Sequence, residues 1–221
     1  MPEQRILHAG LRERVTSAAQ AAALIRPGET VAMSGFTGSG YPKAVPQALA
    51  SHIEAAHARG EAFRINLLTG ASTAPELDGA LAQVDGLAMR MPFQSDPGAR
   101  KRINAGALDY LDIHLSHVAQ HVWFGFYNQI DTAVVEVAAI LEDGSLVPTT
   151  SVGNNKTWLD LAQRVIIEVN QWQPVELLGM HDIYYGTALP PHRRPIPMTR
   201  GDERIGQTTL RCDPDKIAAV V

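Results

Sequence analysis

The residues best suited to chemistry lie in one glycine-rich stretch, 30–46, which reads TVAMSGFTGSGYPKAVP. It begins as a short apolar strand, passes through three closely spaced glycines and turns helical from Ala44. A strand, a glycine-rich turn and a helix place backbone N–H groups where they can face an anion or a developing negative charge. Three glycines and Lys43 exceed what a tight turn requires, so we predict a ligand-binding loop. Its candidate residues are Gly35, Phe36, Thr37, Gly38, Ser39, Gly40, Tyr41, Pro42 and Lys43.

Three further loops follow predicted strands and are small, polar or glycine-containing: 70–73, 93–96 and 149–155. In a parallel sheet, ligands bind where the loops after the strands gather at the carboxyl ends. Tight turns alone would also explain these residues, so both interpretations stay open for the three loops. The weaker cleft candidates are Gly70, Ala71, Ser72, Gln94, Ser95, Ser151, Asn154 and Asn155.

Standard nucleotide and hydrolase motifs do not match the glycine-rich loop. A dinucleotide fingerprint, G-x-G-x-x-G, would need a glycine where Pro42 stands. A phosphate loop would need serine or threonine after Lys43, and the residue there is Ala44. Ser39 lies in G-S-G and not in the G-x-S-x-G elbow of a serine hydrolase. These three classes are disfavoured.

Two glutamates, Glu136 and Glu168, lie inside apolar strands, where a carboxylate is costly unless it is paired. Either could be a nucleophile or base with a shifted pKa. Alternatively, each reaches a strand edge or an internal arginine, such as Arg64 or Arg90. We favour the structural role for both.

A histidine cluster is the strongest candidate for a metal site, because His117 and His121 have the i, i+4 spacing that puts two ligands on one helix face. His114 precedes them. No H-E-x-x-H motif is present and no nearby carboxylate completes a ligand set, so we predict an exposed helix face and no metal.

The composition indicates a globular protein with a real core, since 45% of the 221 residues are apolar. A net charge of −4 argues against a nucleic-acid-binding surface. The single cysteine, Cys212, excludes a disulfide framework and fits a reducing cytoplasm. No apolar run approaches the roughly 20 residues of a membrane helix, and the first ten residues lack a signal-peptide core. We therefore expect a cytoplasmic protein that does not bind membranes.

Alternating strands and helices predict an α/β fold: an open, mostly parallel sheet flanked by helices, with one antiparallel hairpin around 142–145 and then a proline-rich extended arm. One amphipathic helix is predicted over 10–25, with Thr16 or Ser17 as a possible cap. The α/β domain is expected over 1–172, and the arm over 173–221. The strands are predicted at 30–34, 63–69, 87–91, 110–114, 132–141 and 164–169.

Several segments in the same order resemble the acetyl-CoA hydrolase/transferase family, which contains the class I CoA-transferases that use acetate and succinate. They are SGFTGSGYPKAVPQAL, PFQSDPGARKRINAG, DIHLSHVAQ, GSLVPTTSVGNNKTW and GMHDIYYG. The resemblance is collinear from Ile6 to Val221 and implies the first of two α/β domains, with 173–221 leading to a missing carboxyl-terminal catalytic domain. It also implies a coenzyme A thioester as substrate and no permanently bound cofactor. The implied partners are a small carboxylate such as acetate or succinate, the chain's own carboxyl-terminal domain and a second copy in a homodimer.

The resemblance further implies covalent catalysis by a glutamate of the second domain. No residue here matches that motif, so Glu136 and Glu168 do not inherit the role, and 35–43 would line the cleft between the domains. Two alternatives remain open. One is a non-catalytic module from a truncated gene that binds CoA or a partner. The other is a sugar-phosphate isomerase-like enzyme, against which the missing phosphate loop counts.

Overall fold

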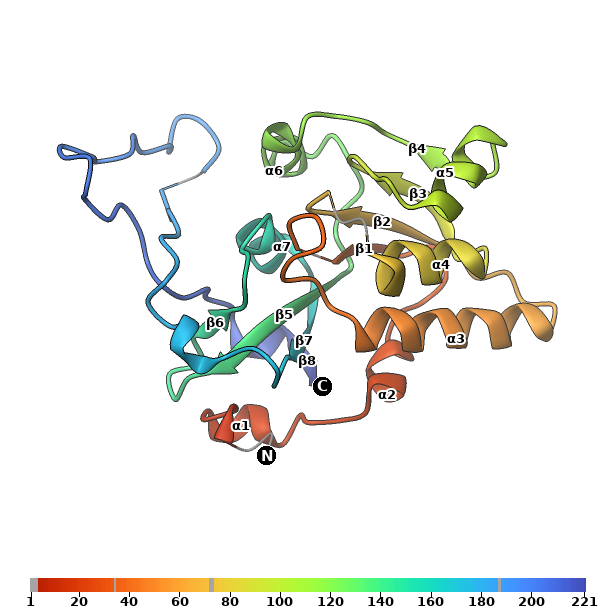
Figure 1. The fold of residues 1–221 in the computed structure, drawn as a ribbon, viewed down its shortest axis with the longest axis horizontal. Coiled ribbons are helices and arrows are strands. Elements are labelled where there is room, and N and C mark those ends of the chain that lie inside the picture. The colour runs from red at the N-terminus through yellow and green to blue at the C-terminus, as the bar shows by residue number, and fades with distance from the viewer. Residues whose placement is uncertain (1–3, 34, 72–73, 187) are drawn as a thin grey trace.

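Eight strands form one sheet at the centre of the molecule, which is described over residues 4–33, 35–71, 74–186 and 188–221 of a computed structural model (Figure 1). They are β1 (Thr30–Met33), β2 (Ile65–Thr69), β3 (Leu87–Met91), β4 (Asp109–Tyr110), β5 (Thr132–Ile140), β6 (Leu146–Pro148), β7 (Arg164–Val169) and β8 (Ile217–Val220). The order is β4-β3-β2-β1-β5-β7-β8, with parallel neighbours throughout. Of the strands described, β6 alone runs antiparallel to its neighbour, β5. The predicted open, mostly parallel α/β sheet is therefore confirmed.

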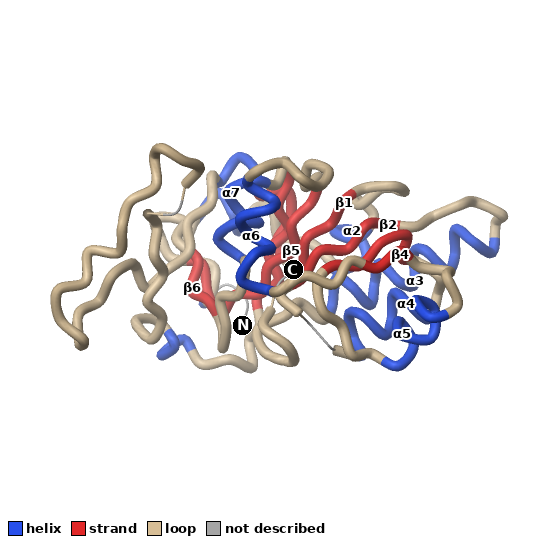
Figure 2. Tube along the Cα trace, turned by 90° about the horizontal axis from the view of Figure 1, so that it is seen from above, coloured by secondary structure: helices blue, strands red, loops and turns tan. Residues whose placement is uncertain are grey.

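Helices cover both faces of this sheet (Figure 2). They are α1 (Ala9–Arg12), α2 (Ala18–Ala22), α3 (Ala44–Ala58), α4 (Ala80–Gln83), α5 (Pro97–Asn104), α6 (Leu115–Trp123) and α7 (Asn155–Leu161), with a π-helical turn at Pro75–Gly79 and 3₁₀ turns at Val175–Leu177 and Pro214–Lys216. Apolar side chains of α2 to α5 pack on one face, and those of α1, α6 and α7 pack on the other. Because both faces are covered, the central strands are continuous apolar runs. None of the helices described here is both long and apolar enough to cross a membrane.

The prediction of one helix over 10–25 is wrong, because the segment forms α1 and α2 with a break between them. The possible cap at Ser17 is confirmed: this residue has extended backbone angles, caps α2 and exchanges hydrogen bonds with Gln20 in a capping box. Before it, the backbone N–H of Thr16 donates to the carbonyl of Val220 in β8 at 2.8 Å. The cap and this long-range contact stabilise the break in an alanine-rich sequence.

The proline-rich arm leaves the sheet after β7 and projects at the left of Figure 1. One bridge, Ile183 to Gln207, pairs the two sides of the arm, and another, Leu146 to Leu210, ties the arm to β6. Residues 190–204 of the arm are exposed. The chain then returns, and β8 pairs parallel with β7. Residues 217–220, grouped with the arm in the sequence-based division, thus form part of the sheet.

Candidate functional site

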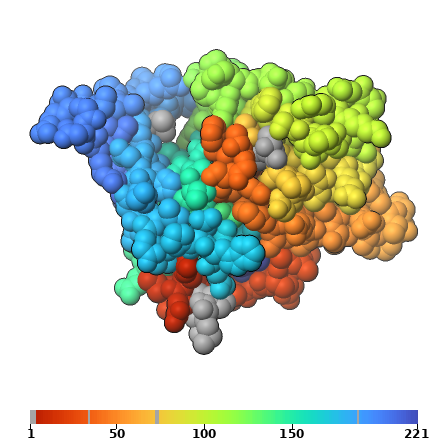
Figure 3. Space-filling view, in the orientation of Figure 1, coloured from red at the N-terminus to blue at the C-terminus, as the bar shows by residue number. Residues whose placement is uncertain are grey.

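The glycine-rich loop connects β1 to α3 at the carboxyl edge of the sheet. Phe36 and Ser39 exchange backbone hydrogen bonds of 2.8 and 3.1 Å, which fold 36–39 into a tight turn. Thr37 has a φ of 52° and Gly40 a φ of 63°. The tip of this turn, from Phe36 to Gly38, is exposed, and the turn protrudes on the face towards the viewer in Figure 3.

The three glycines of the loop have different roles. A Cβ on Gly35 would lie 2.7 Å from the Ser39 carbonyl oxygen, and a Cβ on Gly40 would lie 2.5 Å from the Ser151 Oγ. Both positions therefore require glycine for close approach of the chain. A Cβ on Gly38 would meet nothing within 4 Å. Packing explains Gly35 and Gly40 and leaves Gly38 open to a ligand.

The loop at 149–155 packs directly against the glycine-rich loop. The Ser151 hydroxyl accepts from the Phe36 N–H at 3.1 Å and donates to the Ser39 carbonyl at 2.8 Å. The hydroxyls of Ser39 and Thr150 lie 2.7 Å apart. On the other side, the Thr37 N–H donates to the Gly70 carbonyl at 3.4 Å. Three of the four predicted loops therefore meet at this edge.

The fourth predicted loop, 93–96, has its hydrogen bonds elsewhere. The Gln94 N–H donates to the Tyr110 hydroxyl at 3.3 Å, and Asp96 caps α5. The Gln94 side chain is buried, and its Oε1 has no partner within the described part of the chain. Ser95 is half-buried. These bonds anchor the loop to β4 and α5.

The remaining weaker candidates differ in their surroundings. Ala71 is buried with a φ of 60° beside Gly70, whereas Ser72 lies outside the described residues. Asn154 precedes α7 and Asn155 begins it. Asn155 is fully buried, and both polar atoms of its side chain lack a partner among the residues described.

Glu168 holds the start of α3, although sequence reasoning did not connect the two. Its Oε1 accepts the N–H groups of Lys43 and Ala44 at 2.6 and 3.0 Å, and its Oε2 accepts that of Val45 at 2.9 Å. Burial raises the pKa of the Glu168 carboxyl above its usual range, and these N–H donors act in the opposite direction. The anion cradle predicted at this helix N-terminus is thus occupied by the protein's own carboxylate.

Glu136 lies beside Glu168 in the register of β5 and β7 and anchors the same corner. Its Oε2 accepts from the Lys43 Nζ at 2.6 Å and from the Asn170 amide at 3.1 Å. Its Oε1 accepts from the Thr149 hydroxyl at 2.8 Å. Both glutamates therefore have structural partners at the glycine-rich loop.

Neither arginine suggested by the sequence pairs with these glutamates, so that part of the prediction is wrong. Arg90 forms a fully buried ion pair with Asp78, and Arg64 pairs with Asp85. One sequence signal could have connected Glu136 and Glu168. Each is the fifth residue of an apolar strand, so parallel pairing of the two strands places them side by side.

Tyr41 completes the corner from within the loop. Its ring lies 4.0 Å from the Lys43 Nζ, and its hydroxyl donates to the Glu76 carboxylate at 3.0 Å. Burial, followed by the hydrogen bond to Glu76, raises the pKa of Tyr41 from 10.0 to about 12. Lys43 also donates to the Tyr41 carbonyl at 2.7 Å. The ammonium is thereby fixed at the base of the loop, with 38% of its side chain exposed.

The histidine cluster belongs to α6 and not to this corner. His114 caps the helix, with its Nδ1 accepting from the Ser116 N–H at 3.3 Å. The rings of His117 and His121 stack with centroids 6.0 Å apart, and His121 lies 3.1 Å from the Tyr127 hydroxyl. Within the described residues, no three His, Cys, Asp or Glu side chains are grouped so that they could hold a metal ion.

Solved structures share the open, mostly parallel α/β fold of this chain. The structure resembles RipA from Yersinia pestis with a TM-score of 0.58 at 18% identity, over 74% of this chain and 38% of that one. It also resembles glutaconate coenzyme A-transferase from Acidaminococcus fermentans with a TM-score of 0.56 at 13% identity, over 71% of this chain and 66% of that one. At these identities the likeness shows the fold.

Sequence comparison shows the family. Residues 3–221 match the acetyl-CoA hydrolase/transferase N-terminal domain, and the chain belongs to this family. It is 43% identical to the succinyl-CoA:acetate CoA-transferase of Clostridium kluyveri over 99% of this chain, and 40% identical to the propanoyl-CoA:succinate CoA transferase of Escherichia coli over 93%. An acetyl-CoA hydrolase of Schizosaccharomyces pombe is 39% identical over 94% of this chain. The chain spans 40%, 42% and 40% of these relatives, respectively.

Proposed function

We propose that this chain is the amino-terminal domain of an enzyme that exchanges CoA between an acyl-CoA thioester and a small carboxylate, or releases CoA to water. The observation that carries the proposal is the family match over 3–221, combined with relatives named as CoA-transferases and acetyl-CoA hydrolases. The exposed tip of the glycine-rich loop, supported from below by Glu136 and Glu168, supplies a suitable wall for a substrate cleft.

The proposed chemistry is covalent catalysis by a glutamate of a second domain. Its carboxylate attacks the thioester carbonyl, and the CoA thiolate leaves behind an acyl–glutamyl anhydride. The thiolate then attacks the glutamyl carbonyl, which forms a glutamyl–CoA thioester and releases the first carboxylate. An acceptor carboxylate reverses both steps, whereas water discharges the intermediate in a hydrolase. Each attack places negative charge on an oxygen that needs N–H donors.

Within this chain, the exposed N–H of Gly38 is the donor best placed for that task. Among the described residues it has no hydrogen-bond partner, and no side chain stands within 4 Å of its open face. Glu136 and Glu168 are engaged at the start of α3 and are not offered as nucleophiles. The domain division at 172, a homodimer, a cytoplasmic location and acetate or succinate as acceptor are parts of the same proposal.

The gene beyond Val221 provides the first test. We expect an in-frame continuation that supplies a second α/β half with a glycine-flanked glutamate. The complete product should convert succinyl-CoA and acetate to acetyl-CoA and succinate, and chromatography of the CoA thioesters measures this conversion. Release of the CoA thiol from an acyl-CoA in the absence of acetate would identify a hydrolase. The 221-residue chain alone should show neither reaction. Turnover by this chain, or a complete product without activity on any acyl-CoA, would refute the proposal.

A further inference from the structure

A groove runs between α6, the start of α7 and the arm, beside the glycine-rich loop. Two cavities form it, one of about 400 Å³ and one of about 280 Å³, and they share Ala119, Thr157 and Tyr184 as lining residues. Figure 3 shows an opening between the blue arm and the green helix α6. Together the two cavities have the size of a small-molecule site.

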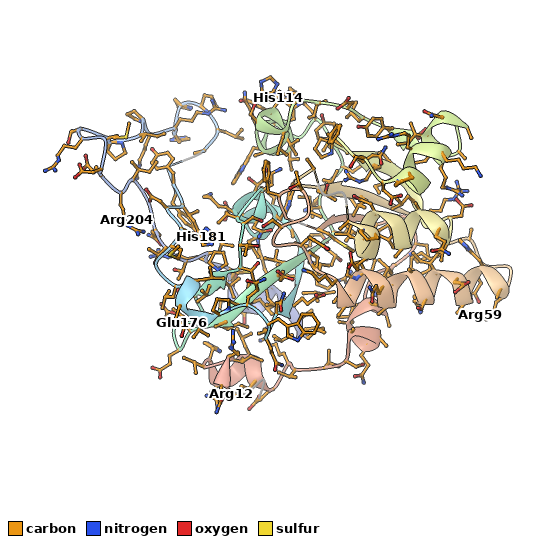
Figure 4. The ribbon with its side chains drawn as sticks, viewed as in Figure 1. Arg12, Arg59, His114, Glu176, His181 and Arg204 are labelled. Carbon is orange, nitrogen blue, oxygen red and sulfur yellow. The ribbon has the colours of Figure 1, made fainter. Side chains whose placement is uncertain are left out.

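One end of the groove begins next to the glycine-rich loop. Val152, Gly153 and Asn154 line the larger cavity, and they directly follow Ser151, which bonds to the loop at Phe36 and Ser39. His181 lines the same cavity and approaches the Thr149 carbonyl with its Nε2 at 2.7 Å. The contact with Thr149 anchors the arm here, and Arg204 joins the other side of the arm to the same point by donating to the His181 carbonyl at 2.9 Å (Figure 4).

The other end of the groove is cationic. Arg193 and Arg194 line the smaller cavity, and the described residues that line it include no carboxylate. Within the described structure the guanidinium of Arg194 has no hydrogen-bond or ion-pair partner. In the larger cavity, Lys156 is paired with Asp160 at 2.6 Å. The net positive charge of the groove is therefore at the arm.

The larger cavity also contains one carboxylate, that of Asp182, which is already engaged in hydrogen bonds within the arm. Both oxygens of Asp182 accept backbone N–H groups, from Ile205 at 3.0 Å and Gly206 at 2.7 Å. The contacts of Asp182 hold the two sides of the arm together and leave its oxygens already satisfied.

A buried donor and two aromatic rings also favour a polar ligand. The Nδ2 of Asn154 is buried in the wall of the larger cavity and has no acceptor among the described residues. A buried N–H without an acceptor costs free energy, which an oxygen of a ligand would recover. Trp123 and Tyr184 line the smaller cavity and offer flat surfaces to a heteroaromatic ring.

We propose that this groove binds the phosphorylated nucleotide end of the acyl-CoA, with the phosphates at Arg193 and Arg194 and the base between Trp123 and Tyr184. The thin pantetheine chain would then follow the larger cavity past Asn154 towards Gly38. This inference rests on the proposed function, because that function makes CoA the ligand. Guanidinium groups suit phosphates since their planar donors form charge-assisted hydrogen bonds.

Isothermal titration of the 221-residue chain with adenosine 3′,5′-bisphosphate, the nucleotide end of CoA, tests the proposal. We expect binding that weakens as salt is added, because the contacts are ionic. Arg194→Ala should weaken it about tenfold, and a double variant with Arg193→Ala should weaken it further. Arg200→Ala is the matched control, since Arg200 lies on the same arm and pairs with Asp202 at 2.9 Å. It should bind as the unaltered chain does.

The outcomes separate this inference from the proposed function. Absence of binding, or equal binding by the Arg194→Ala and Arg200→Ala variants, overturns the nucleotide site even if the complete gene product transfers CoA. In the complete product, Arg194→Ala should raise the KM for succinyl-CoA about tenfold and leave the KM for acetate unchanged. An equal rise in both KM values would also overturn the site. A complete product that binds the nucleotide through Arg194 but neither transfers CoA nor hydrolyses any acyl-CoA would instead refute the proposed function.

Discussion

The start of α3 and the groove beside the arm treat their polar groups in opposite ways. Glu168, Glu136 and Lys43 have protein partners at 2.6 to 3.0 Å. In the groove, the Asn154 amide and the Arg194 guanidinium have none within the described structure. A satisfied network rigidifies a scaffold, whereas unsatisfied donors mark a surface that a ligand completes. The difference separates the support of the candidate site from its proposed recognition surface.

Removal of the Glu168 carboxylate is expected to give the largest effect. Glu168→Ala leaves the three N–H groups of Lys43, Ala44 and Val45, at the start of α3, without their acceptor, so the free energy of unfolding should fall by about 3 kcal/mol. Thermal unfolding of a chain of this size should shift down by roughly 6 to 12 °C. Glu176→Ala, at an exposed position, is the control. Equal stability of the two variants would show that the carboxylate does not hold the helix.

Removal of the Lys43 ammonium should have a smaller effect, because part of this side chain is exposed. Lys43→Met leaves Glu136 buried without its cation and should lower the free energy of unfolding by about 2 kcal/mol. A second change, Glu136→Gln, should then cost less than it does in the unaltered chain. Urea unfolding of the four proteins measures this coupling. Additive effects would contradict a direct pair, and Lys101→Met on the exposed face of α5 serves as the control.

Gly40 and Gly38 provide a matched pair within one loop. Gly40→Ala places a Cβ against Ser151 at a φ of 63°, and should cost about 2 kcal/mol in urea unfolding. Gly38→Val should leave stability within about 0.5 kcal/mol, because its open face meets no atom within 4 Å. In the proposed complete enzyme, Gly38→Val should nonetheless reduce turnover of the acyl-CoA. Unchanged kinetics would reject a ligand role for the loop tip.

Substitution of Asn155 should stabilise the protein, unlike the substitutions above, because the buried amide of this residue has no partner among the described residues. Asn155→Leu removes two unsatisfied polar atoms at similar volume and should raise the free energy of unfolding by about 1 kcal/mol. Asn104→Leu, on the exposed face of α5, should change it little. Destabilisation by Asn155→Leu would mean that the amide has an acceptor in solution.

Tyr41→Phe should have the smallest effect on the free energy of unfolding, and only at alkaline pH. Its pKa is raised from 10.0 to about 12, so the folded state retains a proton that the unfolded state has lost. The contribution of Tyr41 to the free energy of unfolding is therefore complete below pH 10 and is lost as the pH rises towards 12. Chemical unfolding in this interval should show a shallower loss of stability for Tyr41→Phe than for the unaltered chain. Equal slopes would contradict the shift.

Local patterns predicted much of the sheet from the sequence. β3 and β7 have the predicted bounds, because each is an apolar run that ends at polar or proline residues. The break between α1 and α2 was missed because it depends partly on the contact between Thr16 and Val220, which lie at opposite ends of the chain. Helical propensity alone contains no information about such a partner.

The sequence predicted where the candidate site lies in the fold, but not which residues form hydrogen bonds around it. The loop 35–43 followed from its glycines and from the rule that ligands bind at carboxyl edges. Its contact with Ser151 could not be predicted, because it depends on the antiparallel return of β6 along β5, which brings 149–151 to the loop after β1. The partners of Glu136 and Glu168 likewise required the register of β5 and β7, which is a long-range property. The sequence of the arm has no periodicity, so the groove between the arm, α6 and α7 could not be predicted from it.

The position of β8 also bears on how the molecule is made. Residues 217–220 pair with β7, and about fifty residues of arm separate the two strands in the sequence. The edge of β7 therefore stays open while the ribosome synthesises the arm. An open strand edge is a site for pairing with other chains. We therefore expect a nascent chain stopped at residue 172 to aggregate or recruit a chaperone, and the same chain released after β8 to remain dispersed.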